Sequence, residues 1–291
     1  MTTSETHTLE VPGAVLTYDI RGTAATTSNR PLFLVGSPMD ASGFATLSGF
    51  FADRVIVTYD PRAVGRSRRT DDAAEYTPLV HADDIAAVIT ELDAGPVDML
   101  ASSGGAVNAL ALVGRGDDDL VTTLVAHEPP TAQFLPDRDV ILAVCDDMYD
   151  TYQARGLGPA MAKFVALVSQ KGELASSYLD EPEPNPAQFG LPTEDDGDRT
   201  DPLIGLNIRT CTSYEFDVDA LRAASTRVVI GTGVESSGEV AHRSAAALAA
   251  AAGLEQIDFP SGHNGFLGGE YGMHGEPDGF AQTLRRILDA E

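Results

Sequence analysis

Six short, almost uninterrupted apolar runs recur along this chain, and longer stretches with helical spacing separate them. Runs of this length, rich in Val, Ile and Leu, are typical of strands covered on both faces of a parallel sheet. They lie at 31–35, 54–59, 97–101, 121–126, 227–231 and 256–259, with helical spacing between them at, for example, 79–92 and 242–252. Because such strands are joined by right-handed helical crossovers, we expect an α/β fold with a mostly parallel, doubly wound sheet.

The alternation breaks in two places. Near the start, strand-like runs at 8–11 and 14–20 flank a Pro-Gly turn signal, which predicts an antiparallel hairpin that feeds the sheet. Later, about 100 residues separate the fourth run from the fifth, although a crossover needs only about a dozen. The excess predicts an inserted helical lobe. We therefore expect a core of residues 1–130 and 221–291 and a helical cap of residues 131–220.

Within the lobe, periodicity predicts helices over 140–154, 159–169 and 203–214. Residues 180–201 are rich in Pro, Glu, Asp and Gly, which predicts an exposed loop. Five large side chains of the first two helices could line an apolar pocket, although helical spacing more often marks simple packing. They are Met148, Tyr149, Tyr152, Met161 and Phe164.

Composition limits the class of protein more than it limits the activity. Asp and Glu outnumber Lys and Arg by 44 to 19, and a net charge of −25 repels nucleic acid and anionic membranes. The opening residues 1–10 are polar, and no run approaches the roughly 20 apolar residues of a membrane span. We expect a cytoplasmic protein that acts on a small molecule. Whether it forms a homodimer is left open by the sequence. Cys145 and Cys211 are expected to be inert thiols, since neither has a metal-ligand spacing.

The third apolar run ends in Ala-Ser-Ser-Gly-Gly-Ala at 101–106. Ser103 has small residues two positions before and two after it, as a nucleophile elbow between a strand and a helix requires. The spacing has a physical cause, because a bulky flanking side chain at so sharp a turn would strike a neighbouring strand or helix. Ser102 fails the pattern, since Leu100 lies two before it. We therefore predict that Ser103 is a nucleophile.

With this elbow, the chain resembles the α/β-hydrolase fold superfamily over nearly its whole length. Leu-Val-Gly-Ser-Pro at 34–38 resembles the H-G-x-P loop of that superfamily, with Val35 in place of His. Asp-Pro-Arg-Ala-Val-Gly-Arg-Ser at 60–67 resembles its D-x-R-G-x-G-x-S segment, with Ala63 in place of a Gly. The predicted lobe sits where these enzymes carry a helical cap, and Phe-Pro-Ser-Gly-His at 259–263 resembles the segment that delivers their catalytic histidine.

Two further segments, Val-Pro-Gly-Ala at 11–14 and His-Glu-Pro-Pro at 127–130, resemble a bacterial subgroup of these hydrolases that uses no cofactor. The resemblance implies that neither a metal nor an organic cofactor is needed. It also implies an oxyanion hole made by the backbone N–H groups of Ser37 and Gly104, because acyl transfer needs two such donors aimed at the developing negative charge.

His263 is the candidate base. It follows the last predicted strand and a glycine, so it should emerge at the carboxyl edge of the sheet, where ligands bind in open α/β folds. It also falls after the nucleophile in the order that this superfamily uses. His127 ends a strand, and its role stays open. Asp60 and Arg62 are expected to hold neighbouring loops rather than to take part in chemistry.

The acid that should orient this histidine is harder to assign. Resemblance places an aspartate about three residues after a glycine in the loop that follows the penultimate strand, but Ser236 stands at that offset from Gly233. Glu235 is the first choice, because it is the only acid early in the loop, and Glu239 lies further along. Glu128, directly after the strand that follows the nucleophile helix, is the alternative, since some α/β-hydrolases place the acid there.

The predicted activity is that of a carboxylesterase-like serine hydrolase, which cleaves an ester or related acyl bond of a small organic substrate through an acyl-enzyme. Two alternatives stay open. The same site could cleave carbon–carbon bonds or cyclise a substrate. The chain could also be a non-catalytic relative that binds a ligand or a partner protein, which the unusual acid keeps in play.

Overall fold

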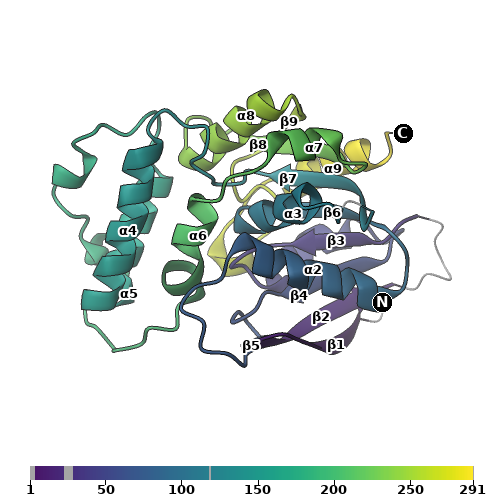
Figure 1. Cartoon of the computed structure of the whole chain (residues 1–291), viewed down its shortest axis with the longest axis horizontal. Helices are drawn as coiled ribbons and strands as arrows, with labels where there is room; N and C mark the ends of the chain where they lie inside the picture. The colour runs from purple at the N-terminus through teal and green to yellow at the C-terminus, as the bar shows by residue number, and fades with distance from the viewer. Residues whose placement is uncertain (1–3, 23–28, 118, 291) are drawn as a thin grey trace.

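The computed structural model describes residues 4–22, 29–117 and 119–290 of the chain. One mixed β-sheet lies at its centre (Figure 1). Among these residues the strand order is β1-β2-β4-β3-β6-β7-β8-β9, with β5 paired to β2. The first two strands form an antiparallel hairpin that joins β4, and every pair from β4 to β9 along this order is parallel. This confirms the predicted fold class. The strands are β1 Ser4–Val11, β2 Ala14–Arg21, β3 Leu32–Val35, β4 Ile56–Asp60, β5 Arg68–Arg69, β6 Val97–Ser102, β7 Val121–His127, β8 Arg227–Gly233 and β9 Glu255–Phe259.

Each face of the sheet has its own apolar core. Successive side chains of a strand point to opposite faces, and in β3 this sends Phe33 and Val35 into one cluster and Leu32 and Leu34 into the other. All four are fully buried. Because both faces are covered, the strand has no polar positions, and this explains why the sequence shows continuous apolar runs rather than alternation.

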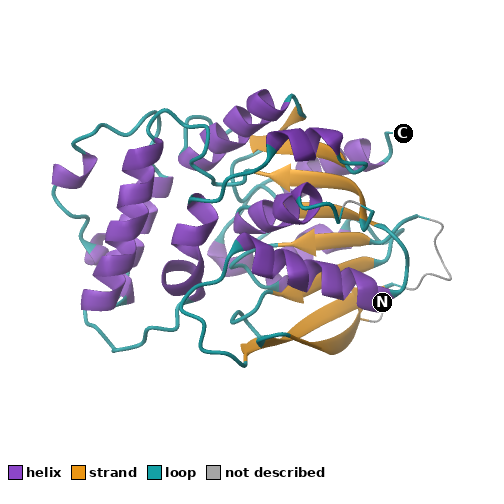
Figure 2. Cartoon of the chain, in the orientation of Figure 1, coloured by secondary structure: helices purple, strands orange, loops and turns teal. Residues whose placement is uncertain are grey.

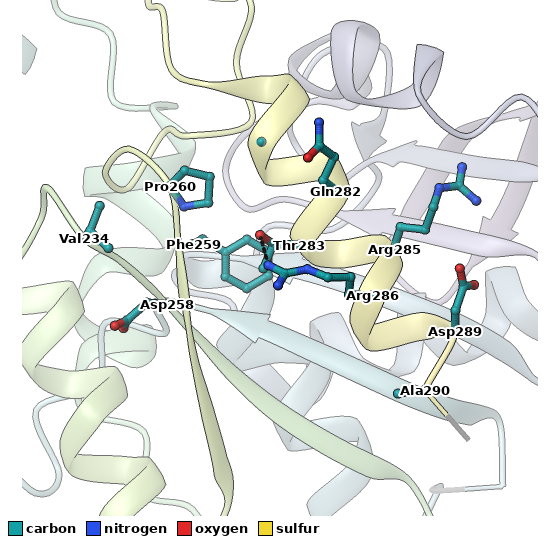
Figure 3. A pocket seen from close by; sticks show the side chains of 11 residues that line it. Val234, Asp258, Phe259, Pro260, Gln282, Thr283, Arg285, Arg286, Asp289 and Ala290 are labelled. Carbon is teal, nitrogen blue, oxygen red and sulfur yellow. Dashed lines mark hydrogen bonds between the residues drawn. The ribbon is translucent and has the colours of Figure 1, made fainter.

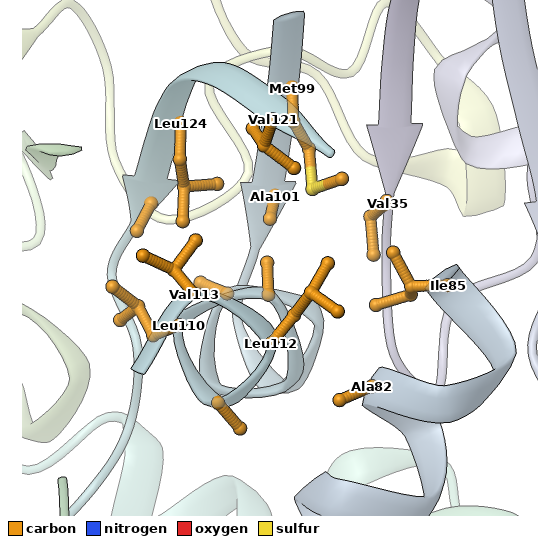
Figure 4. Close-up of a cluster of buried hydrophobic side chains, with 14 of the residues drawn as sticks. Val35, Ala82, Ile85, Met99, Ala101, Leu110, Leu112, Val113, Val121 and Leu124 are labelled. Carbon is orange, nitrogen blue, oxygen red and sulfur yellow. The ribbon is translucent and has the colours of Figure 1, made fainter. Parts of the chain in front are cut away.

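Helices cover both faces (Figure 2). Side chains of α3, among them Leu110 and Val113, meet strand side chains such as Leu124 in the larger cluster (Figure 4). The last helix was not foreseen from the sequence, although Phe280, Leu284 and Ile287 form its buried face. One face is covered by α2 (Pro78–Leu92), α3 (Gly104–Gly114), α7 (Val218–Ala223) and α8 (Val240–Ala252), and the other by α1 (Ala45–Gly49) and α9 (Pro277–Leu288).

Between β7 and β8 the chain forms a helical lobe with a third apolar cluster, at the left of Figure 1. The cluster contains Met148 and Tyr152, so these two side chains pack within the lobe. The predicted helix over 203–214 is irregular, because it starts as a π-helix and continues as α6. Residues 180–201 are largely exposed, as expected. The lobe contains α4 (Arg138–Arg155), α5 (Leu157–Val168), η3 (Tyr178–Asp180), η4 (Pro186–Phe189), η5 (Pro202–Asn207) and α6 (Ile208–Thr212).

In the part of the chain that the structure describes, no helix combines the length and the apolar character needed to cross a membrane.

Candidate active site

Ser103 occupies a sharp turn between β6, which ends at Ser102, and α3, which begins at Gly104. Its backbone has φ 56° and ψ −129°, a conformation that costs a residue with a side chain about 1–3 kcal/mol. Two hydrogen bonds hold it there. Its N–H donates to the carbonyl of His127 on β7 at 3.0 Å, and its own carbonyl accepts from Ala106 at 2.9 Å. The fold therefore maintains a strained serine at the carboxyl edge of the sheet.

The two glycines after Ser103 are required by close backbone contacts. A Cβ at Gly105 would lie 2.6 Å from the carbonyl oxygen of Val35, and a Cβ at Gly104 would lie 2.7 Å from that of Ser37. Both distances are too short for a side chain, so the small-residue pattern has the physical cause expected from the sequence. The same contacts place the loop after β3 directly against the start of α3.

The predicted oxyanion residues line one cavity together with the predicted nucleophile and base. The cavity has a volume of about 590 Å³, and Ser37, Ser103, Gly104 and His263 all contribute to its wall. Ser37 is buried and Ser103 is half-buried. The structure therefore brings all four residues to one place at the carboxyl edge of the sheet.

The lobe supplies much of the opposite wall of this cavity. Ile141 of α4 and Phe164 and Leu167 of α5 line it with apolar surface. Of the five large lobe side chains singled out in the sequence, Phe164 lines the cavity. Tyr149 instead carries the guanidinium of Arg209 over its ring at 3.7 Å.

A second hollow lies between β9 and α9 (Figure 3). Its volume is larger, about 1120 Å³, but it is open to solvent and none of the predicted site residues lines it. Thr283 and Arg286, which are joined by a hydrogen bond of 3.0 Å, form part of its wall. The smaller cavity is therefore the candidate active site.

The imidazole of His263 is held by Glu128. The distance from His263 Nδ1 to Glu128 Oε2 is 2.7 Å, and the Glu128 side chain is completely buried. Because a carboxylate can only accept, Nδ1 must carry a proton, and in the neutral form of the imidazole Nε2 then has a free lone pair. This is the tautomer that a general base requires. Glu128 follows β7 directly and, like Ser103, has a positive φ, here 48°, which is uncommon for a residue with a side chain.

The other oxygen of Glu128 is also fully engaged. Oε1 accepts from the backbone N–H of Gly233 at 2.8 Å and from the hydroxyl of Ser236. Burial raises the pKa of this carboxyl group, but the hydrogen bond from His263, the nearby imidazoles and the Ser236 hydroxyl outweigh it and lower the pKa to about 2. His242 Nδ1 lies 3.6 Å from the same oxygen and donates to the carbonyl of Gly233 at 3.0 Å. The carboxylate therefore stays charged near neutral pH.

The expectation that Glu235 rather than Glu128 orients the imidazole is wrong for this structure. Glu235 is exposed, and its carboxylate accepts from Ser261 at 3.2 Å. Glu239 precedes α8 and lines the cavity wall, whereas Ser236, at the offset where resemblance placed an aspartate, donates to Glu128. The physical reason is strand pairing, because β7 and β8 are parallel neighbours and their carboxyl ends meet. Either loop can present a carboxylate to the same imidazole.

His127 forms part of the floor behind this site. It is fully buried, its ring meets those of Phe259 and Phe280 at centroid distances of 5.5 and 5.2 Å, and burial lowers its pKa to about 4. The ring of His263 is also near, at a centroid distance of 6.2 Å. His127 is therefore a neutral packing residue that contributes its backbone carbonyl to the Ser103 turn.

Asp60 and Arg62 hold loops, as the sequence suggests. Asp60 accepts from the N–H of Ala41 at 3.0 Å and pairs with Arg66, which ties the segment after the Ser37 loop to the end of β4. Arg62 makes two hydrogen bonds of 2.6 and 2.7 Å with buried Asp84. Neither side chain lines the candidate cavity.

Residues 47–269 match the model of the family described as alpha/beta hydrolase fold. Among curated proteins, the chain is 27% identical to the uncharacterised hydrolase YraK of Bacillus subtilis over 293 residues. The aligned region covers 98% of this chain and 96% of that protein.

Solved structures with a similar fold include a thermophilic esterase from Thermogutta terrifontis, with a TM-score of 0.66, 17% identity and coverage of 99% of this chain and 98% of that one. They also include the enol-lactonase from Burkholderia xenovorans, with a TM-score of 0.68, 16% identity and coverage of 97% and 99%. At these identities the likeness concerns the fold alone.

Proposed function

The chain belongs to the alpha/beta hydrolase fold family, and from this premise we propose that it is a serine hydrolase that cleaves an ester or related acyl bond of a small organic substrate. The observation that carries the proposal is the 2.7 Å contact between His263 Nδ1 and the buried carboxylate of Glu128, in a site whose cavity also contains the strained Ser103. A nucleophile, a correctly protonated base and an acid are the parts that acyl transfer needs.

In the proposed reaction, Ser103 Oγ attacks the carbonyl carbon while its proton moves to Nε2 of His263. The N–H groups of Ser37 and Gly104 stabilise the oxyanion, and Glu128 stabilises the imidazolium. The C–O bond to the leaving group then breaks, and the leaving alcohol takes the proton from His263. A water molecule, deprotonated by His263, attacks the acyl-enzyme, which releases the carboxylic acid and returns the proton to Ser103.

We infer that the helical lobe selects the substrate, because α4 and α5 supply apolar wall opposite the catalytic residues. An esterase and an enol-lactonase among proteins of similar fold are compatible with acyl chemistry. The carboxylate on the imidazole also favours catalysis over a purely ligand-binding role, since such a role would not need a charged group buried beside His263.

The direct test is covalent labelling with a fluorophosphonate, followed by peptide mass spectrometry. We expect one adduct on Ser103, and we expect none in Ser103→Ala with the same circular dichroism spectrum. Intact, folded protein that labels neither with this reagent nor with a smaller sulfonyl fluoride would overturn the proposal.

A further inference from the structure

Two buried side chains in the cavity wall, Asn108 and His81, each carry one polar atom that serves neither the proposed chemistry nor the fold's own hydrogen bonding. Asn108 lies one helical turn after Gly104 on α3, and His81 lies in the first turn of α2, which packs beside α3. Both line the cavity, and each is only 2% exposed. Among the described residues, neither Asn108 Nδ2 nor His81 Nδ1 has a hydrogen-bond partner. Unpaired polar atoms in a buried wall are costly, which points to a ligand that pairs with them.

The proton on His81 can be located from its partner. His81 Nε2 lies 2.7 Å from Asn207 Oδ1, while the Nδ2 of the same amide donates to the carbonyl of Pro202 at 2.5 Å. The second bond fixes which end of the Asn207 amide faces the histidine, so His81 Nε2 donates. Burial lowers the pKa of His81 to about 4, and the ring is therefore neutral near pH 7. His81 Nδ1 is left as a bare acceptor.

Asn108 is the complementary group, because its Nδ2 is a donor without an acceptor. The corner between α2 and α3 thus offers one donor and one acceptor. The cavity wall elsewhere contains two carboxylates, Asp40 and Glu239, and no Lys or Arg among its described residues. A negatively charged group would meet repulsion from these two carboxylates, and the cation near His81, Arg62, is already paired with buried Asp84.

We propose that Asn108 and His81 form a subsite for an uncharged group that both accepts and donates a hydrogen bond, such as a carboxamide, carried on a lipophilic chain. The amide oxygen accepts from Asn108 Nδ2, and an amide N–H donates to His81 Nδ1. The apolar wall of Ile141, Phe164 and Leu167 covers the chain of the same substrate. This specificity rests on the proposed ester hydrolysis and narrows its substrate class.

The test compares esters that differ only at one end. The 4-nitrophenyl ester of 6-amino-6-oxohexanoic acid ends in a carboxamide, that of 6-methylheptanoic acid ends in an isopropyl group of the same shape, and mono-4-nitrophenyl adipate ends in a carboxylate. The acetates of 6-hydroxyhexanamide and 6-methylheptan-1-ol carry the carboxamide and the isopropyl group on the alcohol side of the ester instead of the acyl side. Wild-type kcat/KM reports hydrolysis, while calorimetric Kd values on Ser103→Ala report binding of the intact esters.

We expect the carboxamide to bind at least as tightly as the isopropyl end in one of the two halves, and the carboxylate to bind roughly a hundredfold more weakly than the carboxamide. Asn108→Leu should lower the carboxamide-to-isopropyl affinity ratio about tenfold, since one hydrogen bond is lost. His81→Phe should lower it similarly, and it keeps the test available if Asn108→Leu does not fold. Glu91→Gln, on the exposed side of α2 and outside the cavity lining, should leave the ratio unchanged.

The possible failures are separable. Hydrolysis of all esters with a ratio that neither variant changes would overturn the subsite and leave the serine hydrolase standing. If Ser103→Ala binds the carboxamide ester more tightly than the isopropyl ester but the wild type hydrolyses neither, the subsite would be supported and the proposed reaction overturned. An isopropyl end that binds more than about tenfold tighter than the carboxamide in both halves would also overturn the subsite.

Discussion

The ends of β7 and β8 lie side by side, and a glutamate follows each of them within two residues, but the two glutamates have opposite surroundings. Glu128, after β7, is completely buried, and its two oxygens are shared among His263, Gly233 and Ser236. Glu235, after β8, is exposed, and its carboxylate accepts a hydrogen bond from Ser261 at 3.2 Å. Their distances from the strand ends, one residue for Glu128 and two for Glu235, do not explain this difference. What separates them is burial together with a complete set of donors, and these depend on how the two loops pack.

The largest effect should come from exchanging these acids for isosteric amides. Glu128→Gln would donate from its amide to Nδ1 of His263, which moves the imidazole proton to Nε2 and leaves no base for Ser103. We expect kcat/KM for a 4-nitrophenyl ester, and the rate of fluorophosphonate labelling, to fall about 10³- to 10⁴-fold. Glu235→Gln is the matched control and should stay within about twofold of wild type. Loss of activity in Glu235→Gln but not in Glu128→Gln would reverse the assignment.

The same contrast should appear in the pH dependence of stability. The pKa of Glu128 is about 2 in the folded protein, below its ordinary value of 4.5. Its charged form therefore contributes stability above about pH 4.5, and this contribution is lost as the pH falls toward 2. Between about pH 4.5 and pH 2, the free energy of unfolding of the wild type, measured with urea, should fall by up to about 3 kcal/mol more than that of Glu128→Gln. Glu235→Gln should follow the wild type, and a gap between wild type and Glu128→Gln that does not vary with pH would contradict this.

Much of the site could be predicted from the sequence because local rules fix it. The apolar runs identify the strands, and the small residues around Ser103 reflect the contacts of Gly104 and Gly105 with the loop after β3. His263 follows from its place after the last strand. These features depend on short segments whose geometry the residue types themselves determine.

The acid could not be assigned in this way, because its role depends on a packing contact between two loops that are about 100 residues apart in the chain. One signal was present, namely that Ser236 stands where resemblance places an aspartate, so that an acid had to come from elsewhere. The Asn108 and His81 pair was missed for a similar reason. In the sequence, Asn108 and His81 are ordinary positions of two different predicted helices. Only the structure shows that both line the same cavity.

If Ser236 occupies the site of a displaced acid, a carboxylate placed there should partly replace Glu128. Its hydroxyl already reaches Glu128 Oε1, and the residue is only 2% exposed. In Glu128→Ala, removal of the larger side chain leaves room for Ser236→Asp to approach the imidazole. We expect the double variant to regain about tenfold or more of the kcat/KM lost in Glu128→Ala. Adding Glu235→Asp to Glu128→Ala instead should regain nothing, and equal recovery by both would refute the special position of Ser236.

The smallest effect should come from Ser236→Ala alone. Glu128 then loses one of its donors but keeps the N–H of Gly233 and the contact with His263, so the carboxylate is less firmly held but still charged. Hydrogen bonds to a charged group contribute about 1.5–3 kcal/mol, and part of this loss is recovered because His242 lies 3.6 Å from the same oxygen. We expect kcat to fall by about three- to tenfold with KM nearly unchanged, and Ser236→Thr, which retains the hydroxyl, to lose less. A rise in KM with kcat intact would instead mean that Ser236 shapes the cavity rather than the position of Glu128, since removing a uniform binding contact affects KM alone.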